Sequence, residues 1–283
     1  MKLQNILRAI RRADQDFNLI DDGDRIALAL SGGKDSMLLW LALSQYQKFK
    51  GKNFTVCAIH IDVGFSEKET ALMQDFAKKY DLELHIIPTR INEILQMQQN
   101  LQGEKISCSL CSTLKKGMLI DEAKKLGCNK VALGHHGDDA VETVLLNLIH
   151  GGRFATFAPI QYMSRADIHM IRPMVYLKEE DIIKACALNE IPAVKPVCPN
   201  DGTSQRQEMK DMLSSLYDAY PSAHDNFFKA LVNRKEDRLW MTETDRKASG
   251  LPERELTGAQ SRRKPEQANK SEQTETDRAE KAE

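Results

Sequence analysis

The sequence predicts an α/β fold: a parallel sheet of about five strands with helices on both faces, followed by a helical C-terminal extension. Short apolar runs alternate with helically periodic stretches as far as residue 175, the pattern of parallel strands joined by crossover helices. Hydrophobic residues make up 41% of the 283 residues, which is enough for a sizeable core. Beyond residue 175 the pattern is helical only.

The elements are predicted in chain order. An amphipathic helix is expected over residues 3–17, where Leu3, Ile6, Leu7 and Ile10 recur at helical spacing. Strands are predicted at residues 25–30, 55–61, 82–87, 130–133 and 168–174. Helices between and after them are predicted at residues 36–46, 67–80, 138–150, 178–189, 204–217 and 222–240.

These elements predict four parts of the chain: an N-terminal helix (1–20), a nucleotide-binding α/β domain (21–175), a helical region (176–240) and a tail (241–283). The tail has no aromatic residue, is rich in Gln, Ser and Thr, and mixes acidic with basic residues. Such a segment cannot bury a core, so we expect it to be disordered.

Composition narrows the functional classes. The formal net charge is −1, so no overall basic field indicates a nucleic-acid partner, and any RNA contact must come from local patches. No apolar run is long enough for a membrane span, and the N-terminal residues lack the apolar segment of a signal peptide. We therefore expect a cytoplasmic protein without a membrane partner, whose six cysteines are thiols or metal ligands.

A glycine-rich turn joins the first predicted strand to the next helix, with the sequence Ser31-Gly32-Gly33-Lys34-Asp35-Ser36. The glycines allow a sharp turn and a close approach to a ligand, and the helix N-terminus offers unpaired N–H groups to an anion. Two hydroxyls and one lysine add further contacts. These features predict a phosphate site that differs from a Walker A loop in its glycine and lysine spacing; an ordinary capped strand–helix junction is the structural alternative.

This hexapeptide resembles the SGGxDS loop of the PP-loop ATP pyrophosphatases, which cleave ATP to AMP and pyrophosphate. The resemblance implies a Rossmann-like, adenine nucleotide alpha hydrolase-like sheet, with the loop holding the pyrophosphate portion of ATP. It also implies that backbone near Ile61, at the end of the second strand, contacts adenine. A plain strand end with a glycine turn is the alternative for that segment.

A second polar segment follows the fourth predicted strand: Gly134-His135-His136-Gly137-Asp138-Asp139. Acidic residues at a helix start can simply complement the helix dipole. Two aspartates beside a bound triphosphate can also bind Mg²⁺, which prefers carboxylates and phosphate oxygens. We favour the functional interpretation, with Asp35, Asp138 and Asp139 as catalytic candidates and Gly134 in the ATP site. The segment resembles the GHHxDDxxxT element of PP-loop tRNA-modifying enzymes.

Three cysteines are candidate metal ligands. Cys108 and Cys111 form a CxxC motif, which by spacing alone fits a redox pair as well as part of a metal site. Cys198 lies in a proline-rich loop that would hold its thiolate rigidly. The other three cysteines, Cys57, Cys128 and Cys186, are predicted to be structural.

The order of motifs resembles the tRNA 2-thiocytidine synthetase (TtcA) family over about residues 1–240: the CxxC segment, the GHHGDD element, IRPMVYLKEEDI, Cys198 and Gln205-Arg206-Gln207. That family modifies cytidine 32 of tRNA and carries a [4Fe–4S] cluster on three cysteines, which correspond to Cys108, Cys111 and Cys198. The chain departs from the family at Glu142, where Gln is typical, and at Pro199-Asn200, near which a second Cys is typical.

The resemblance implies an enzyme that uses ATP and Mg²⁺ to adenylate a base carbonyl and replaces the oxygen with sulfur. A cysteine desulfurase would supply the sulfur, tRNA would be the substrate, and a homodimer is suggested. Two other functions fit the motifs: a PP-loop amidotransferase or ligase, which needs no cluster, and a non-catalytic ATP-binding redox sensor.

Overall fold

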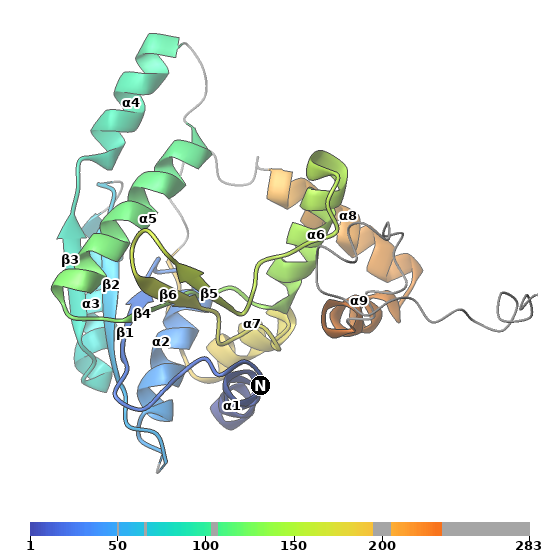
Figure 1. Ribbon diagram of the computed structural model, residues 1–283, viewed down its shortest axis with the longest axis horizontal. Coiled ribbons are helices and arrows are strands. Elements are labelled where there is room, and N and C mark those ends of the chain that lie inside the picture. The colour runs from blue at the N-terminus through green and yellow to red at the C-terminus, as the bar shows by residue number, and fades with distance from the viewer. Residues whose placement is uncertain (50, 65–66, 103–106, 195–204, 234–283) are drawn as a thin grey trace, which may run out of the picture. The chain divides into compact units, whose positions relative to one another are not determined.

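The computed structural model describes residues 1–49, 51–64, 67–102, 107–194 and 205–233 (Figure 1). Residues 1–232 form one compact unit, and residues 233–283 are assigned to a second unit of which only Asn233 is described. The disorder predicted for residues 241–283 therefore concerns residues outside the described part. The domain boundaries predicted at residues 21 and 176 stay predictions.

A mostly parallel sheet forms the centre of the first unit (Figure 1). Its six strands run in the order β3-β2-β1-β4-β6-β5, and every neighbouring pair is parallel except β5 and β6. The strands are β1 (Arg25–Ala29), β2 (Thr55–Asp62), β3 (Leu84–Pro88), β4 (Lys130–Ala132), β5 (Ile160–Met163) and β6 (Ile168–Ile171).

The described residues form nine helices around this sheet. They are α1 (Leu3–Phe17), α2 (Lys34–Tyr46), α3 (Glu67–Tyr80), α4 (Ile91–Gln102), α5 (Cys108–Lys125), α6 (Gly137–Gly151), α7 (Glu179–Leu188), α8 (Gln205–Ala219) and α9 (Ala223–Val232). Helices α8 and α9 contact each other and α6, and build the predicted helical extension.

Side chains of the parallel strands alternate between two hydrophobic cores, as the period of two in a strand requires. On one face Ile26 and Leu28 pack with residues of α1, α2, α3 and α7. On the other face Ala27 and Ile59 pack with residues of α4 and α5. Helices thus cover both faces of the sheet, which confirms the predicted fold class.

The sheet has two edges with different contents, and we name them by strand direction. The carboxyl edge is where β1, β2, β4 and β6 end, and the amino edge is where they begin. Strand β1 has β2 on one side and β4 on the other, so the connections out of β1 and β4 diverge at the carboxyl edge between them. Ligands bind at such a switch point in open α/β sheets.

The structure differs from the predicted elements in several places. The sheet has six strands because β5, a four-residue antiparallel edge strand with two exposed residues, has too short an apolar pattern to be predicted. Helix α4 was not predicted either. Strand β6 ends at Ile171, two residues before Pro173, which has no N–H for the ladder. Helix α9 ends at Val232, before the predicted end.

Among the described residues, no helix has the length and apolarity that a transmembrane span requires.

Candidate active site at the carboxyl edge of the sheet

Residues 31–36, the predicted phosphate loop, connect β1 to α2 at the carboxyl edge. The loop is tied by its own hydroxyls: Ser31 Oγ lies 3.0 Å from Ser36 Oγ, and Ser36 Oγ donates to the Gly33 carbonyl at 3.0 Å. Gly32 has φ +81°, a left-handed conformation that favours glycine. Its carbonyl accepts a hydrogen bond from Val194 N–H at 2.9 Å. The loop is therefore held in one shape before any ligand arrives.

The second polar segment packs directly against this loop. A Cβ placed on Gly134 would lie 3.2 Å from the backbone N of Ser36 and 3.3 Å from the carbonyl carbon of Asp35. A larger residue at position 134 would push the loop aside, which explains the glycine. The close contact brings residues 31–36 and residues 134–139 together, as the two motifs predicted.

Lys34 points to carboxylates instead of open solvent. Its Nζ lies 3.1 Å from Asp35 Oδ2 and 2.9 Å from Glu179 Oε1. Burial lowers the pKa of Lys34, but the two carboxylates outweigh it, and the net pKa is raised. The lysine thus remains charged at the phosphate loop. Glu179 also contacts Lys210 of α8 at 2.6 Å, so α7 and α8 are connected to the loop through charges.

The three candidate aspartates differ in their partners. Asp35 Oδ1 is buried and has no hydrogen-bond partner among the described residues. Both oxygens of Asp138 are occupied: Glu179 N–H donates to Oδ2 at 2.6 Å, and His224 Nε2 lies 2.6 Å from Oδ1. Burial raises the pKa of Asp138, but these contacts and His136 outweigh it and lower it to about 2. Asp138 is therefore an ionised group that joins α6, α7 and α9.

Asp139 occupies an intermediate position. Its Oδ2 accepts the His136 backbone N–H at 2.9 Å and so caps α6, while Oδ1 accepts from Arg206 of α8 at 3.0 Å. Arg206 also approaches Glu142 Oε2 at 4.0 Å. Burial, and next Asp139, raise the pKa of Glu142 to about 7. The Arg206 guanidinium thus balances the acidic pair Asp139 and Glu142 on α6.

The pKa values of the two adjacent histidines are shifted in opposite directions. Burial lowers the pKa of His135 to about 4, so it is neutral near pH 7. Burial also lowers the pKa of His136, but the carboxylates of Asp138, Asp139 and Asp35 outweigh it and raise the pKa. His136 Nε2 lies 3.5 Å from Asp139 Oδ2 and 3.9 Å from Asp35 Oδ1. His136 therefore lies between two of the candidate catalytic carboxylates.

Ile61 lies near the end of β2 and its side chain is buried in the core under α4 and α5. Strand β1 ends at Ala29, in register with Ile59, whereas β2 continues to Asp62. Backbone at Ile61 thus extends past the end of β1 beside the phosphate loop. The backbone role at Ile61 stays a prediction, and the Ile61 side chain belongs to the core.

The predicted cluster ligands are only partly described. Cys108 is exposed and Cys111 is half-buried. Cys108 is the first residue of α5 and Cys111 follows three residues later, so the two are neighbours on the surface of the helix. Ser107 caps this turn by accepting the Leu110 N–H at 3.2 Å. Since α5 leads into β4, its N-terminus lies towards the carboxyl edge. Cys198 lies outside the described residues.

Sequence reasoning missed Glu179, Lys210, Arg206 and His224, which surround the aspartates. Gln205-Arg206-Gln207 contributed to the family resemblance, but nothing in the local pattern indicated that Arg206 meets α6. These contacts depend on how α7, α8 and α9 pack, which periodicity does not specify. The sequence offered only a weak signal for these four residues: each is charged or titratable, and Glu179 and Arg206 lie within segments that carry the family resemblance.

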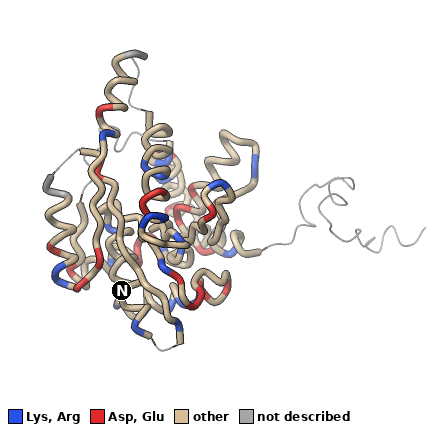
Figure 2. The backbone as a smooth tube through the Cα atoms, turned by 60° about the vertical axis from the view of Figure 1, so that its left-hand side comes forward, with Lys and Arg blue, Asp and Glu red and all other residues tan. Residues whose placement is uncertain are grey.

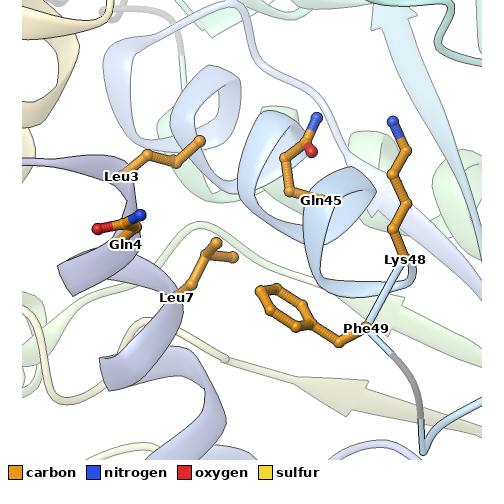
Figure 3. A pocket seen from close by; sticks show the side chains of 6 residues that line it. All are labelled: Leu3, Gln4, Leu7, Gln45, Lys48 and Phe49. Carbon is orange, nitrogen blue, oxygen red and sulfur yellow. The ribbon is translucent and has the colours of Figure 1, made fainter.

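A separate apolar pocket lies between α1 and the end of α2 (Figure 3). Its lining residues are Leu3, Gln4, Leu7, Gln45, Lys48 and Phe49. Lys48 and Phe49 follow the C-terminal end of α2, whereas the phosphate loop lies at its N-terminal end. The pocket is therefore not part of the candidate active site.

Comparison with known proteins agrees with these motifs. A family model described as a PP-loop domain matches residues 4–208. A tRNA-cytidine(32) 2-sulfurtransferase of Geobacter sulfurreducens is 37% identical over 235 residues, covering 82% of this chain and 91% of that protein. One from Neisseria meningitidis is 36% identical over 247 residues, covering 86% of this chain and 76% of that protein.

A solved structure shares the fold. The U34-tRNA thiolase NcsA from Methanococcus maripaludis, determined with its [4Fe–4S] cluster, superposes with a TM-score of 0.64 and 22% sequence identity. The match covers 80% of this chain and 76% of that chain. Together with the sequence matches, the glycine loop, the GHHGDD element and the CxxC segment show that the chain belongs to the PP-loop superfamily and, within it, to the tRNA-cytidine(32) 2-sulfurtransferase family.

Proposed function

We propose that this protein is an ATP-dependent tRNA sulfurtransferase that converts cytidine 32 to 2-thiocytidine. The observation that carries the proposal is the contact between residues 31–36 and residues 134–139 at the carboxyl edge. It joins a glycine turn suited to phosphates with carboxylates suited to a metal ion. The family membership supplies the substrate class, and the geometry supplies a place for ATP.

The phosphate loop would hold the β and γ phosphates. The N-terminus of α2 offers backbone N–H groups and the positive end of a helix dipole, and Lys34 adds a charge. In this arrangement the base oxygen attacks the α phosphorus, pyrophosphate leaves, and the base carries AMP as a leaving group. Catalysis would then come from positioning and from stabilising charge on the phosphates.

The residues present fit a magnesium ion. Asp35, within the loop, offers a hard oxygen ligand: its Oδ1 is buried and has no hydrogen-bond partner within the described residues. Asp139 would be the second carboxylate through Oδ1, in place of its contact with the exposed Arg206, and Asp138 would position α7 and α9 through its bonds to Glu179 and His224. Bound there, Mg²⁺ would neutralise charge that develops on the departing pyrophosphate.

The described cysteines also fit an iron–sulfur cluster. Cys108 and Cys111 lie at the capped N-terminus of α5, and cysteine thiolates are the protein ligands of such clusters. We propose Cys108, Cys111 and Cys198 as ligands of a [4Fe–4S] cluster, which would present sulfur from an iron without a protein ligand. A cysteine desulfurase would supply that sulfur.

Docking of tRNA would depend on local charge. Basic and acidic residues are interspersed along the backbone (Figure 2). We therefore propose that local groups of Lys and Arg contact the phosphate backbone. We also propose, on the resemblance alone, that the enzyme acts in the cytoplasm as a homodimer.

The direct test is mass spectrometry of tRNA nucleosides from a strain that lacks the gene. We expect 2-thiocytidine to disappear and to return with the wild-type gene or with Asp75→Asn, a matched control at an exposed aspartate of α3. Asp35→Asn should not restore it. An unchanged nucleoside profile in the deletion strain would reject the tRNA assignment. Loss of a different thionucleoside would reject cytidine 32 and keep thiolation.

A further inference from the structure

A second group of metal-binding side chains lies at the amino edge of the sheet, away from the predicted cluster ligands. Ligand atoms of Cys57, Glu83 and His85 all lie within 4.8 Å of one another. Cys57 is near the start of β2, His85 is in β3, and Glu83 is the residue directly before β3. Cys128, which precedes β4, is not among these three mutually close residues, but its Sγ lies 3.6 Å from Cys57 Sγ and could reach the same ion as a fourth ligand.

We infer that Cys57, Cys128, Glu83 and His85 form a binding site for a borderline divalent cation, with Zn²⁺ as the expected metal. Two thiolates, an imidazole and a carboxylate are a ligand set that Zn²⁺ takes. Two sulfur atoms that bind one zinc ion tetrahedrally at about 2.3 Å lie about 3.8 Å apart. The observed sulfur separation of 3.6 Å is close to that value.

Charge and access also suit a cation. Arg25 donates to Glu83 Oε1 at 2.9 Å, and its guanidinium would balance the site: two thiolates and one carboxylate against Zn²⁺ and one arginine. Both cysteines are buried, whereas Glu83 is exposed and His85 half-buried, so a cation can enter from the side of these two residues.

Cobalt(II) binding to the full-length chain tests the site, because Co²⁺ reports thiolate ligation by charge-transfer absorption and tetrahedral geometry by visible d–d bands. The predicted cluster ligands Cys108, Cys111 and Cys198 are first replaced by serine, so that they cannot bind the probe. We expect one equivalent of Co²⁺ with both signals. Zn²⁺ should displace it, since Zn²⁺ binds such ligands more tightly.

Single substitutions in that background identify the ligands. Cys57→Ser and Cys128→Ser should each weaken binding by on the order of a hundredfold or more, beyond the 10–100-fold lost with an outer-shell partner. Cys186→Ser removes a different buried thiol and should change nothing. Glu83 and His85 are nearer the surface, so His85→Ala and Glu83→Gln keep the test valid if a buried substitution prevents folding. Each should weaken Co²⁺ binding and alter the d–d bands. Absent charge-transfer absorption, or binding that survives both cysteine substitutions, would overturn the inference.

Discussion

The two edges of the sheet treat buried polar groups in opposite ways. At the amino edge, Lys130 Nζ contacts Leu19 O at 3.0 Å, Asp21 Oδ2 at 2.8 Å and Asp24 Oδ2 at 2.7 Å, so each of its three N–H groups has an acceptor. At the carboxyl edge, buried atoms of Asp35 and His136 have no hydrogen-bond partner within the described residues. The first arrangement stabilises the fold; the second leaves capacity for a ligand.

This difference has an energetic meaning. A buried polar atom without a partner costs about 1–3 kcal/mol, so such atoms are rare unless a function requires them. Three such atoms, in Asp35, His135 and His136, belong to the phosphate loop and the GHHGDD element, whereas the amino edge has one at the start of β1, Arg25 Nε. Substitutions should therefore affect stability at the amino edge and catalysis at the carboxyl edge.

The largest expected effect is on stability at the amino edge. Lys130→Ala removes the cation between two carboxylates and leaves Asp24, 4% exposed, as a buried charge with only neutral donors from Asp21 and Asn129. We expect the free energy of unfolding to fall by about 3–5 kcal/mol, as for other broken buried pairs. Urea denaturation measures it. Lys125→Ala, at an exposed lysine, is the control and should change it by no more than about 0.5 kcal/mol. Equal effects of the two would remove the distinction between the edges.

Asp35→Asn should have the second largest effect, on catalysis alone. It keeps the shape of the side chain and removes the charge of a carboxylate whose Oδ1 has no hydrogen-bond partner among the described residues and whose Oδ2 contacts Lys34 Nζ at 3.1 Å. We expect the rate of pyrophosphate release to fall by about 10²–10³-fold, as when one group that stabilises transition-state charge is lost. Unfolding in urea should be unchanged or shifted to higher concentration. A variant with a normal rate would show that Asp35 has no catalytic role.

Glu142 provides a pH-dependent test of the carboxyl edge. Its folded-state pKa is raised to about 7, so the folded protein binds this proton more tightly than the unfolded chain does. The resulting stability is present below about pH 4.5 and is lost as the pH rises through 7. Relative to Glu142→Gln, the wild type should lose about 3 kcal/mol between pH 4.5 and 8, at about 1.4 kcal/mol per pKa unit. A stability difference that stays constant with pH would contradict this assignment.

The smallest expected effect concerns the loop itself. Ser31→Ala removes the hydroxyl that lies 3.0 Å from Ser36 Oγ and accepts from the Gly33 N–H at 3.4 Å. We expect ATP binding to weaken by about 1 kcal/mol, which is several-fold in the dissociation constant measured by calorimetry. Ser215→Ala, on the exposed surface of α8, should leave binding unchanged. Undiminished ATP binding by Ser31→Ala would mean that the loop does not depend on this hydroxyl.

Much of this arrangement could be predicted from sequence because it depends on local pattern. The alternation of apolar runs with helical periodicity predicted the parallel strands, and residues 31–36 and 134–139 predicted where the site lies. The partners of the aspartates could not be predicted, since Arg206, Glu179 and His224 reach them through helix packing. The group around Cys57 was likewise hidden, because it forms only when strands distant in sequence lie side by side.

The cleavage product of ATP tests the central claim most directly. If residues 31–36 hold the β and γ phosphates while the base attacks the α phosphorus, the purified enzyme with Mg²⁺ and substrate tRNA must release AMP and pyrophosphate. Separation of the nucleotides should show AMP in proportion to the sulfur incorporated, formed about 10²–10³-fold more slowly with Asp35→Asn. Release of ADP and phosphate in that assay would contradict the account.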